Sequence, residues 1–341
     1  MNPLPSSTHH YIVFLQAAFL PVPEISLPAP STVTKALYAQ TSPSELHERI
    51  RDASIIVLSA LKLDATALSP EVTPHLKFVV VAATGTDCID LEACKARGIV
   101  VSNCPNANVE SVSEHAIGLY FTTRRKLIDM HNLTRRGDWP ERKTLMYNIL
   151  DKKGQPPLTC QEEVAGIIGN GAVGKRIASI ARALGMKVLI SGRKNPKEAS
   201  LMNGSHSERT PFETVLKEST VIFIAVPLTE STRDMISTPE LDVISQHAVV
   251  VNVSRGGVVN EKAIVKALKD GSIAGAATDV FSEEPAGLDN SALLTEETND
   301  LNLVVTPHMA WLSQKTWVNQ SQMVKRVIEE WHSGKPINVV A

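Results

Sequence analysis

Short apolar runs alternate along this chain with stretches whose apolar residues recur at helical spacing. Several of the runs are continuous in Val, Ile and Leu rather than alternating with polar residues, which is typical of parallel strands buried on both faces. The pattern predicts an α/β protein with doubly wound parallel sheets. The expected strands are Tyr11–Leu15, Ile55–Ser59, Lys77–Ala82, Val164–Ile168, Lys187–Ile190, Val221–Ala225, Ala248–Val253, Ile273–Thr278 and Leu301–Val305.

Two long helical stretches divide the chain. One runs from about Asn108 to Arg136, and the other follows the last strand from about Trp311 to Ser333. A chain that leaves its first domain through one long helix can return to it through another. We therefore expect two doubly wound domains, of which the first is discontinuous and comprises 1–107 plus 309–341, around a contiguous second domain at 108–308. The 341 residues suit two domains.

The composition is that of an ordinary folded protein, with 43% apolar and 21% charged residues. A net charge of -2 gives no long-range attraction to nucleic acid or to an anionic membrane. The early apolar run Tyr11–Leu20 is too short to span a bilayer, and no Lys or Arg precedes it. The four cysteines form no C-x-x-C pair and no metal-type spacing, so we expect reduced thiols, no metal site and a cytoplasmic protein.

A three-glycine turn, Gly169-x-Gly171-x-x-Gly174, lies between an apolar strand and a helix with one apolar face. Gly169 allows the tight turn, Gly171 lets the backbone approach a pyrophosphate, and Gly174 lets helix and strand pack closely. The helix N-terminus then directs free N–H groups at the phosphates. The sequence therefore predicts a nicotinamide dinucleotide site.

The end of the following strand bears on the choice of cofactor. An acidic residue at this point would bind the ribose 2′-hydroxyl of NAD. Here the strand is followed by Ser191-Gly192-Arg193-Lys194, and no Asp or Glu occurs before Glu198. A hydroxyl and two cations suit the 2′-phosphate of NADP. We expect NADP(H) to be preferred, whereas a solvated basic turn that accepts NAD(H) is the alternative.

Three further strand ends carry polar side chains, and ligands of open α/β sheets bind at that edge. Arg255 follows a buried strand and precedes two glycines, so it can hold a carboxylate through a two-pronged pair. Glu284 lies in the segment after the next strand, and His308 directly ends the last one. Taken alone, each residue also has a purely structural interpretation. Arg255 could be a surface-turn residue, Glu284 could lie in a solvated loop, and His308 could be a packed histidine.

Together the three residues supply what the reduction of a 2-keto acid requires. Arg255 would anchor the carboxylate, and His308 would donate a proton to the carbonyl oxygen. Glu284 would hold the imidazole ring and favour its protonated form near neutral pH.

These residues stand in motifs that resemble the D-isomer-specific 2-hydroxyacid dehydrogenase family over nearly the whole chain. The matching stretches are Gly166–Gly174, Pro227–Thr229 with Thr232, Val251–Gly257, Asp279–Pro285, Thr306–Trp311, Ala82–Asp87, Ile89–Leu91, Arg97–Val101 and Ser113–His115. The resemblance implies the roles given above for Arg255, Glu284 and His308. It also implies that both domains are Rossmann-like, with a substrate-binding domain at 1–107 plus 309–341 and a dinucleotide-binding domain at 108–308. A homodimer formed through the dinucleotide-binding domain is implied as well.

The resemblance implies further site residues. Asp279 would lie near the nicotinamide, the loop Thr84-Gly85-Thr86 would offer backbone N–H groups to the substrate carboxylate, and Trp311 would line the substrate pocket. The remaining residues of the expected cofactor site are Asn170, Ala172, Val173, Val226, Pro227, Thr232 and Val253.

Within the family, Ile12–Leu15 and Val81–Gly85 resemble the glycerate dehydrogenase and hydroxypyruvate reductase branch. The expected reaction is reduction of a small 2-keto acid, of the glyoxylate or hydroxypyruvate type, to the D-2-hydroxy acid with NADPH. Three alternatives remain: an NAD-dependent enzyme for another or bulkier substrate, formate dehydrogenase, which pairs its histidine with Gln rather than Glu, and an NAD(H)-sensing corepressor.

Overall fold

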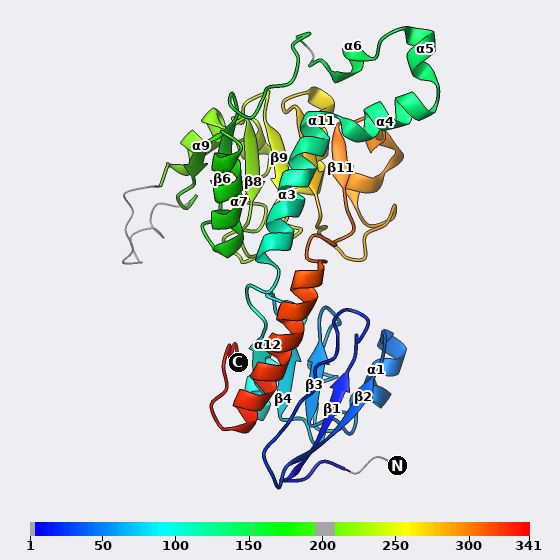
Figure 1. Cartoon of the computed structure of the whole chain (residues 1–341), viewed down its shortest axis with the longest axis vertical. Coiled ribbons are helices and arrows are strands. Elements are labelled where there is room, and N and C mark those ends of the chain that lie inside the picture. Colours follow the sequence, from blue (N-terminus) through cyan, green and yellow to red (C-terminus); the bar gives the residue numbers. More distant parts are fainter. Residues whose placement is uncertain (1–3, 152, 195–208) are drawn as a thin grey trace. The chain divides into compact units, whose positions relative to one another are not determined.

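The structure is a computed structural model that describes residues 4–151, 153–194 and 209–341 (Figure 1). The chain divides into two compact units, and each is described by itself. Unit 1 comprises Met1–Asn108 and Leu312–Ala341, and unit 2 comprises Val109–Trp311. None of the helices within the described ranges is both long enough and apolar enough to cross a membrane.

Unit 1 is built on a parallel five-stranded sheet of order β2-β1-β3-β4-β5. Helices α1 and α2 pack on one face of the sheet, and the C-terminal helix α12 packs on the other through Val324, Val327 and Ile328. The elements are β1 (His9–Phe14), β2 (Thr32–Leu37), α1 (Pro43–Ile50), β3 (Ile55–Leu58), β4 (Phe78–Val81), α2 (Leu91–Arg97), β5 (Val100–Asn103) and α12 (Gln314–His332).

Unit 2 is built on a parallel six-stranded sheet of order β11-β10-β9-β8-β6-β7. The strands are β6 (Val164–Ile168), β7 (Lys187–Ile190), β8 (Val221–Ile224), β9 (Val249–Asn252), β10 (Gly275–Thr278) and β11 (Leu303–Val305). The chain passes from β6 outward to β7 and then returns across β6 to β8, so the strand order reverses between β6 and β8. Ligands of such sheets bind at the carboxyl ends of the strands around this point.

The helices of unit 2 cover both faces of the sheet. On one face α3 and α7 pack, and on the other α9, α10 and α11 pack. The segment α4–α6 extends away from the sheet (Figure 1). The helical elements are α3 (Val109–Arg124), α4 (Leu127–Arg135), α5 (Asp138–Arg142), α6 (Met146–Ile149), α7 (Ala172–Ala183), α9 (Phe212–Glu218), α10 (Thr238–Leu241), α11 (Glu261–Asp270), η1 (Ala292–Leu294) and η2 (Glu296–Thr298).

The expected fold class, two doubly wound parallel sheets, is confirmed, and each strand expected from the sequence is present. Two strands were missed. β2 is a half-exposed edge strand with no strong apolar run, and β5 is only four residues long. The single long helix expected from Asn108 to Arg136 is wrong: the chain breaks at Lys126, which adopts a left-handed conformation with φ 46°, so α3 and α4 are separate helices.

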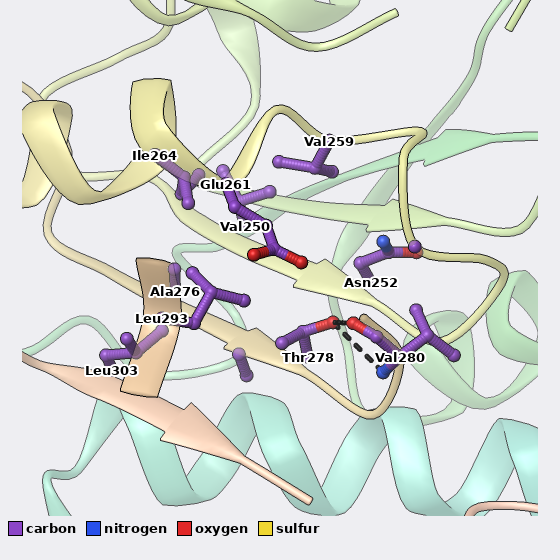
Figure 2. Close-up of a pocket in the computed structure, with 12 residues that line it drawn as sticks. Val250, Asn252, Val259, Glu261, Ile264, Ala276, Thr278, Val280, Leu293 and Leu303 are labelled. Atoms are coloured by element: carbon purple, nitrogen blue, oxygen red, sulfur yellow. Dashed lines mark hydrogen bonds between the residues drawn. The ribbon is translucent and has the colours of Figure 1, made fainter. Parts of the chain in front are cut away.

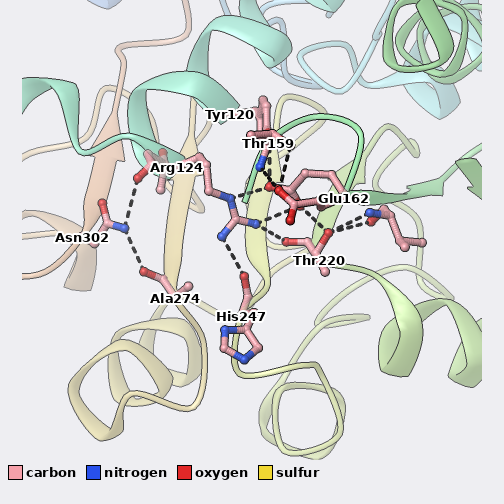
Figure 3. Close-up of polar contacts among 11 residues, drawn as sticks. Tyr120, Arg124, Thr159, Glu162, Thr220, His247, Ala274 and Asn302 are labelled. Carbon is pink, nitrogen blue, oxygen red and sulfur yellow. Dashed lines mark hydrogen bonds and ion pairs between the residues drawn. The ribbon is translucent and has the colours of Figure 1, made fainter. Parts of the chain in front are cut away.

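A buried ion pair ties α3 to the amino-terminal edge of this sheet. Arg124 Nε lies 2.6 Å from Glu163 Oε1, and both side chains are almost fully buried. Arg124 also donates to the carbonyls of His247 at 2.9 Å and Thr220 at 2.7 Å (Figure 3). Glu163 in turn accepts from the hydroxyls of Tyr120 and Thr220. This buried ion pair, with its hydrogen bonds to two carbonyls, fixes the helix to the sheet at the edge opposite the predicted site.

Candidate active site

The three-glycine turn follows β6 and leads directly into α7. Gly169 has φ 111°, and a Cβ on it would lie 2.2 Å from the carbonyl oxygen of Ala225. A Cβ on Gly174 would lie 1.9 Å from the carbonyl oxygen of Gly169. Both positions therefore exclude any side chain, because the backbones approach too closely.

The middle glycine of the turn faces open space, which is the observation that fits a dinucleotide. A Cβ on Gly171 would meet nothing within 4 Å. Gly171 is also the N-cap of α7, and no side chain caps that helix end. The first N–H groups of α7 thus keep the hydrogen-bonding capacity that a pyrophosphate requires, on residues that include Ala172 and Val173. Asn170 lies in the same turn.

The turn after β7 carries the three residues expected at the 2′-phosphate, and the structure places them differently. Ser191 is buried, and its hydroxyl donates to the carbonyl of Gly192 at 2.7 Å. Lys194 Nζ lies 2.8 Å from Glu240 Oε1 and donates to the carbonyl of Met235 at 3.1 Å. Arg193 is exposed. Glu198, the next acidic residue along the chain, lies outside the described residues.

The loop after β8 approaches the glycine turn. Besides the contact with Ala225, a Cβ on Gly169 would lie 3.0 Å from Cγ1 of Val226. Thr232 closes this loop, because its hydroxyl donates to the carbonyl of Pro227 at 2.7 Å. Val253, at the end of β9, is buried in the core of unit 2.

Arg255 lies in a turn that Asn252 organises. Asn252, the last residue of β9, accepts from the N–H and hydroxyl of Ser254 and donates to the carbonyl of Arg255 at 2.9 Å. The following residue, Gly256, lies against the next loop, since a Cβ there would be 1.8 Å from the carbonyl oxygen of Phe281. The turn that carries Arg255 and the loop that carries Glu284 are therefore in direct backbone contact.

Glu284 and His308 form the central contact of the site. His308 Nδ1 lies 2.6 Å from Glu284 Oε2, and the other carboxylate oxygen accepts from the N–H of Phe281 at 2.9 Å. Both side chains are about one-third exposed. Because the carboxylate binds Nδ1, the ring nitrogen Nε2 is the one directed to other chemistry.

The charge state of Glu284 follows from this setting. Partial burial acts to raise the pKa of its carboxyl, but the hydrogen bonds from His308 and Phe281 act in the opposite direction. The positive charges of His308 and Arg255 add to them, and the pKa of Glu284 falls below its ordinary value. Glu284 is therefore a carboxylate at neutral pH, and Arg255 is close enough to affect it.

Asp279 and Trp311 hold the turn that carries His308. The Asp279 carboxylate accepts from the N–H groups of Met309 at 3.0 Å and Ala310 at 2.8 Å. The indole Nε1 of Trp311 donates to the carbonyl of His308 at 2.9 Å. Both residues were expected at the cofactor or the substrate, and the structure shows them in contact with the backbone around His308.

The remaining expected residues belong to unit 1. Thr84, Gly85 and Thr86 follow β4, and Asn103 Nδ2 donates to the carbonyl of Thr84 at 2.7 Å. Within the described ranges, the backbone N–H groups of Gly85 and Thr86 have no hydrogen-bond acceptor. These groups can receive an anion.

Two cavities in unit 2 lie away from the Glu284–His308 pair. One of about 20 Å³ lies between α11 and the strands β9 and β10 (Figure 2), which is room for a single water. The other, of about 800 Å³, lies at the amino-terminal edge of the sheet and is lined in part by Lys126, His247 and Lys269. Neither is lined by Arg255, Glu284 or His308.

Sequence analysis missed several residues that position the site. Besides Asn252, Glu261 in the first turn of α11 accepts from the N–H of Ser282 at 2.7 Å and the hydroxyl of Ser291 at 2.8 Å, and so holds the loop of Glu284. Asn252 could have been found, because Asn at a strand end commonly binds the backbone two residues on. No local signal marked Glu261, whose partners lie 21 and 30 residues away.

Comparison with known proteins identifies the family of the chain. Residues 117–310 match the model of the D-isomer specific 2-hydroxyacid dehydrogenase NAD binding domain. A glycerate dehydrogenase of Methylorubrum extorquens is 39% identical over 88% of this chain and 89% of its own. A glyoxylate reductase of Thermococcus litoralis is 33% identical over 86% of each chain.

Among solved structures, the NADPH-dependent glyoxylate/hydroxypyruvate reductase of Sinorhizobium meliloti, in complex with NADP and malonate, is 25% identical. It aligns with a TM-score of 0.74 over 97% of each chain. The family model covers more than half of the chain, and the relatives cover most of it. The chain therefore belongs to the D-isomer-specific 2-hydroxyacid dehydrogenase family and is an NAD(P)-dependent oxidoreductase of 2-hydroxy acids.

Proposed function

We propose that this enzyme reduces a small 2-keto acid, of the glyoxylate or hydroxypyruvate type, to the D-2-hydroxy acid with NADPH as the preferred reductant. The observation that carries the proposal is the 2.6 Å contact between His308 Nδ1 and Glu284 Oε2, formed at the carboxyl edge of the sheet near Arg255. The glycerate dehydrogenase and glyoxylate reductases among the relatives support the substrate class.

His308 acts as the proton donor in this proposal. Glu284, kept ionised, accepts the Nδ1–H and stabilises the imidazolium, so the proton available for transfer is on Nε2. As the keto acid is reduced, this proton passes to the carbonyl oxygen, and the neutral ring keeps its hydrogen bond to Glu284. The two residues thus act as an acid and its fixed partner.

Arg255 binds the substrate carboxylate through a two-pronged pair and draws electron density from the adjacent carbonyl. We further propose that the backbone N–H groups of Gly85 and Thr86, with Thr84 beside them, take part in substrate binding. Trp311 fixes the carbonyl of His308 and limits the size of the substrate side chain.

When bound, the nicotinamide cofactor would supply the hydride that the carbonyl carbon accepts. The open space at Gly171 and the uncapped start of α7 would hold its pyrophosphate. Arg193 and Ser191 would meet the 2′-phosphate of NADPH, because no acidic residue stands between 187 and 194. Val226, Pro227, Thr232 and Val253 belong to the same proposed site.

One observation favours a second candidate, an NAD-dependent enzyme of another or bulkier 2-hydroxy acid. Lys194, expected at the 2′-phosphate, is paired with Glu240, so part of its positive charge is neutralised within the protein. Arg193 would then be the main cation for the 2′-phosphate of NADPH, which favours NADPH less than two cations would.

A panel of keto acids tests the proposal directly. Initial rates would be measured for glyoxylate, hydroxypyruvate, pyruvate and a branched keto acid, each with NADPH and with NADH. We expect the highest kcat/KM for glyoxylate or hydroxypyruvate with NADPH. A clear preference for NADH or for the branched acid would instead establish the second candidate, and formate oxidation without keto acid reduction would contradict both.

The assembly we propose is a homodimer formed through unit 2. Several large apolar side chains on the segment α4–α6 and at its start are exposed, and Tyr147 is 72% exposed. Exposed apolar groups on one segment mark an interaction surface. The others are Leu127, Ile128, Trp139 and Met146.

Light scattering after size-exclusion chromatography would give the mass of the assembly. The wild type should elute at twice the 37.0 kDa chain mass, and the double variant Trp139→Ser, Tyr147→Ser should elute as a monomer. The control is Leu288→Ser, which removes an equally exposed apolar residue from another loop. A monomeric wild type would refute the dimer.

A further inference from the structure

The turn that carries His308 is strained and needs support. His308 has φ 54°, a left-handed conformation that residues other than glycine rarely adopt. It directly follows Pro307 and the short strand β11, so few local hydrogen bonds fix it; its own N–H donates to the carbonyl of Thr306 at 3.0 Å. Whatever holds this turn sets the position of the proton donor.

The support comes from Asp279, whose carboxylate contacts the chain on both sides of His308. Its Oδ1 accepts from the Thr306 hydroxyl at 2.6 Å and the Met309 N–H at 3.0 Å, and its Oδ2 accepts from the Ala310 N–H at 2.8 Å. The side chain of Asp279 is 1% exposed, so water does not compete for these bonds. The carboxylate therefore holds the turn as a single piece.

A second histidine, His115, completes the arrangement from α3. Its Nε2 lies 3.0 Å from Thr306 Oγ1 and 3.6 Å from Asp279 Oδ1. The Thr306 hydroxyl has one proton, which it gives to the Asp279 carboxylate, so it can only accept from His115. This count places a proton on Nε2 of His115, and the chain of donors runs from His115 through Thr306 to Asp279.

We propose that His115 is a positioning residue for proton transfer, which acts through Thr306 and Asp279 on the turn of His308. The inference rests on the proposed role of His308 as proton donor. Without the Nε2–H, the Thr306 hydroxyl loses its donor and is free to turn away from Asp279. The carboxylate then holds only the Met309 and Ala310 side of the turn, and the ring of His308 samples positions too far from the substrate.

Two substitutions of His115 separate its hydrogen bond from its bulk. Leu fills a similar volume without a donor, and the Gln side-chain amide can place an N–H near the position of Nε2. For His115→Leu we expect kcat to fall about tenfold to a hundredfold, the usual effect of a misplaced reacting group, with KM for the keto acid changed less than about twofold. His115→Gln should recover most of kcat. Equal loss of kcat in both variants would overturn the proposal.

Thr306→Val tests the path by replacing the hydroxyl with a methyl group. If His115 acts through Thr306, the double variant His115→Leu, Thr306→Val should be no slower than the slower single variant. Multiplied losses would show that the two residues act separately and would overturn the path. The matched control is His47→Leu, the same change on an exposed histidine of α1, which should leave kcat and KM unchanged.

Amide hydrogen exchange gives a readout without substrate. In His115→Leu the N–H groups of Met309 and Ala310 should exchange faster than in the wild type, and in His115→Gln at the wild-type rate. Unchanged exchange in His115→Leu would overturn the positioning role whatever the kinetics. If the wild type reduced no keto acid in the panel, the proposed function would fail, while faster exchange would still establish how the turn is held.

Discussion

Lys194 and Glu240 form an ion pair, with 2.8 Å between Nζ and Oε1, that connects the turn after β7 to α10. Glu240 is nearly buried and also accepts from the N–H of Ser237 at 3.0 Å, so its carboxylate is fixed in place. In the proposed NADPH site, the Glu240 carboxylate would compete with the 2′-phosphate for the charge of Lys194 and would also repel the phosphate.

Removing the charge of Glu240 should therefore strengthen the preference for NADPH. In Glu240→Gln, Lys194 loses its counter-charge, and we expect the ratio of kcat/KM for NADPH to kcat/KM for NADH to rise several-fold, with the NADH value nearly constant. Steady-state kinetics with both cofactors measures the ratio. Glu213→Gln, which breaks an exposed pair with Lys217, is the control. A ratio that stays constant or falls would show that Lys194 plays no part in the choice.

Substitution of the proton donor and of its partner should have graded effects. His308→Ala should lower kcat by about 10²- to 10⁴-fold, the range expected for loss of a general acid. Glu284→Gln keeps the hydrogen bond but removes the charge, so kcat should fall less. The imidazolium of His308 then loses its counter-charge at the moment of proton transfer. A kcat for Glu284→Gln equal to that of the wild type would contradict the charge role of Glu284.

Arg255 should affect substrate binding more than turnover. Loss of a charge-assisted pair costs about 1.5–3 kcal/mol, so Arg255→Ala should raise KM for the keto acid on the order of tenfold to a hundredfold and lower kcat in addition. Arg255→Lys should recover only part of this, since an ammonium cannot form the two-pronged contact. If both variants bind the keto acid normally, Arg255 is not the carboxylate anchor.

The Arg124–Glu163 pair should affect stability without affecting the chemistry. Glu163→Gln leaves the buried guanidinium without its counter-charge, and we expect the free energy of unfolding to fall by about 3–5 kcal/mol in urea titrations. The kinetic constants of the folded enzyme should not change, because the pair lies at the opposite edge of the sheet. Asp270→Asn, which breaks an exposed pair with Lys266, should leave the free energy of unfolding nearly unchanged.

His10 should make unit 1 sensitive to acid. Burial, followed by the positive charges of His332, Lys77 and His9, lowers the pKa of His10 from 6.5 to about 4. Between these two values the unfolded chain binds a proton that the folded chain does not. The Tm should therefore fall as the pH is lowered from about 6.5 to 4. Calorimetry should show a weaker dependence for His10→Gln, and an equal dependence would exclude His10 as the cause.

Much of the fold and the site could be predicted because both rest on short segments. The buried strands are local apolar runs, and Gly169, Arg255 and His308 each stand directly at a strand end, where parallel topology brings them to one edge. Glu284 and His308 are in contact in the structure, as the chemistry required.

What the sequence did not predict depends on partners distant in the chain. The long helix breaks at Lys126, which adopts a left-handed conformation. Because this residue is not a glycine, nothing in the local sequence indicates the break. Lys194 pairs with Glu240, 46 residues further on. The sequence of the basic turn alone could not show that this lysine has a carboxylate partner within the protein. The contacts of Asp279 with Met309 and Ala310 join two neighbouring strand ends, and no spacing rule indicates them.

The close contact between Gly256 and the carbonyl of Phe281 has a consequence for engineering. The backbone after Arg255 and the loop that carries Glu284 share a surface with no room for even a methyl group. A designer who wishes to alter substrate range by exchanging loops with a relative cannot replace one of these segments alone. Residues 254–257 and 279–285 therefore have to be exchanged as one unit, and a graft that keeps both together is the one that should fold with Arg255 and Glu284 in register.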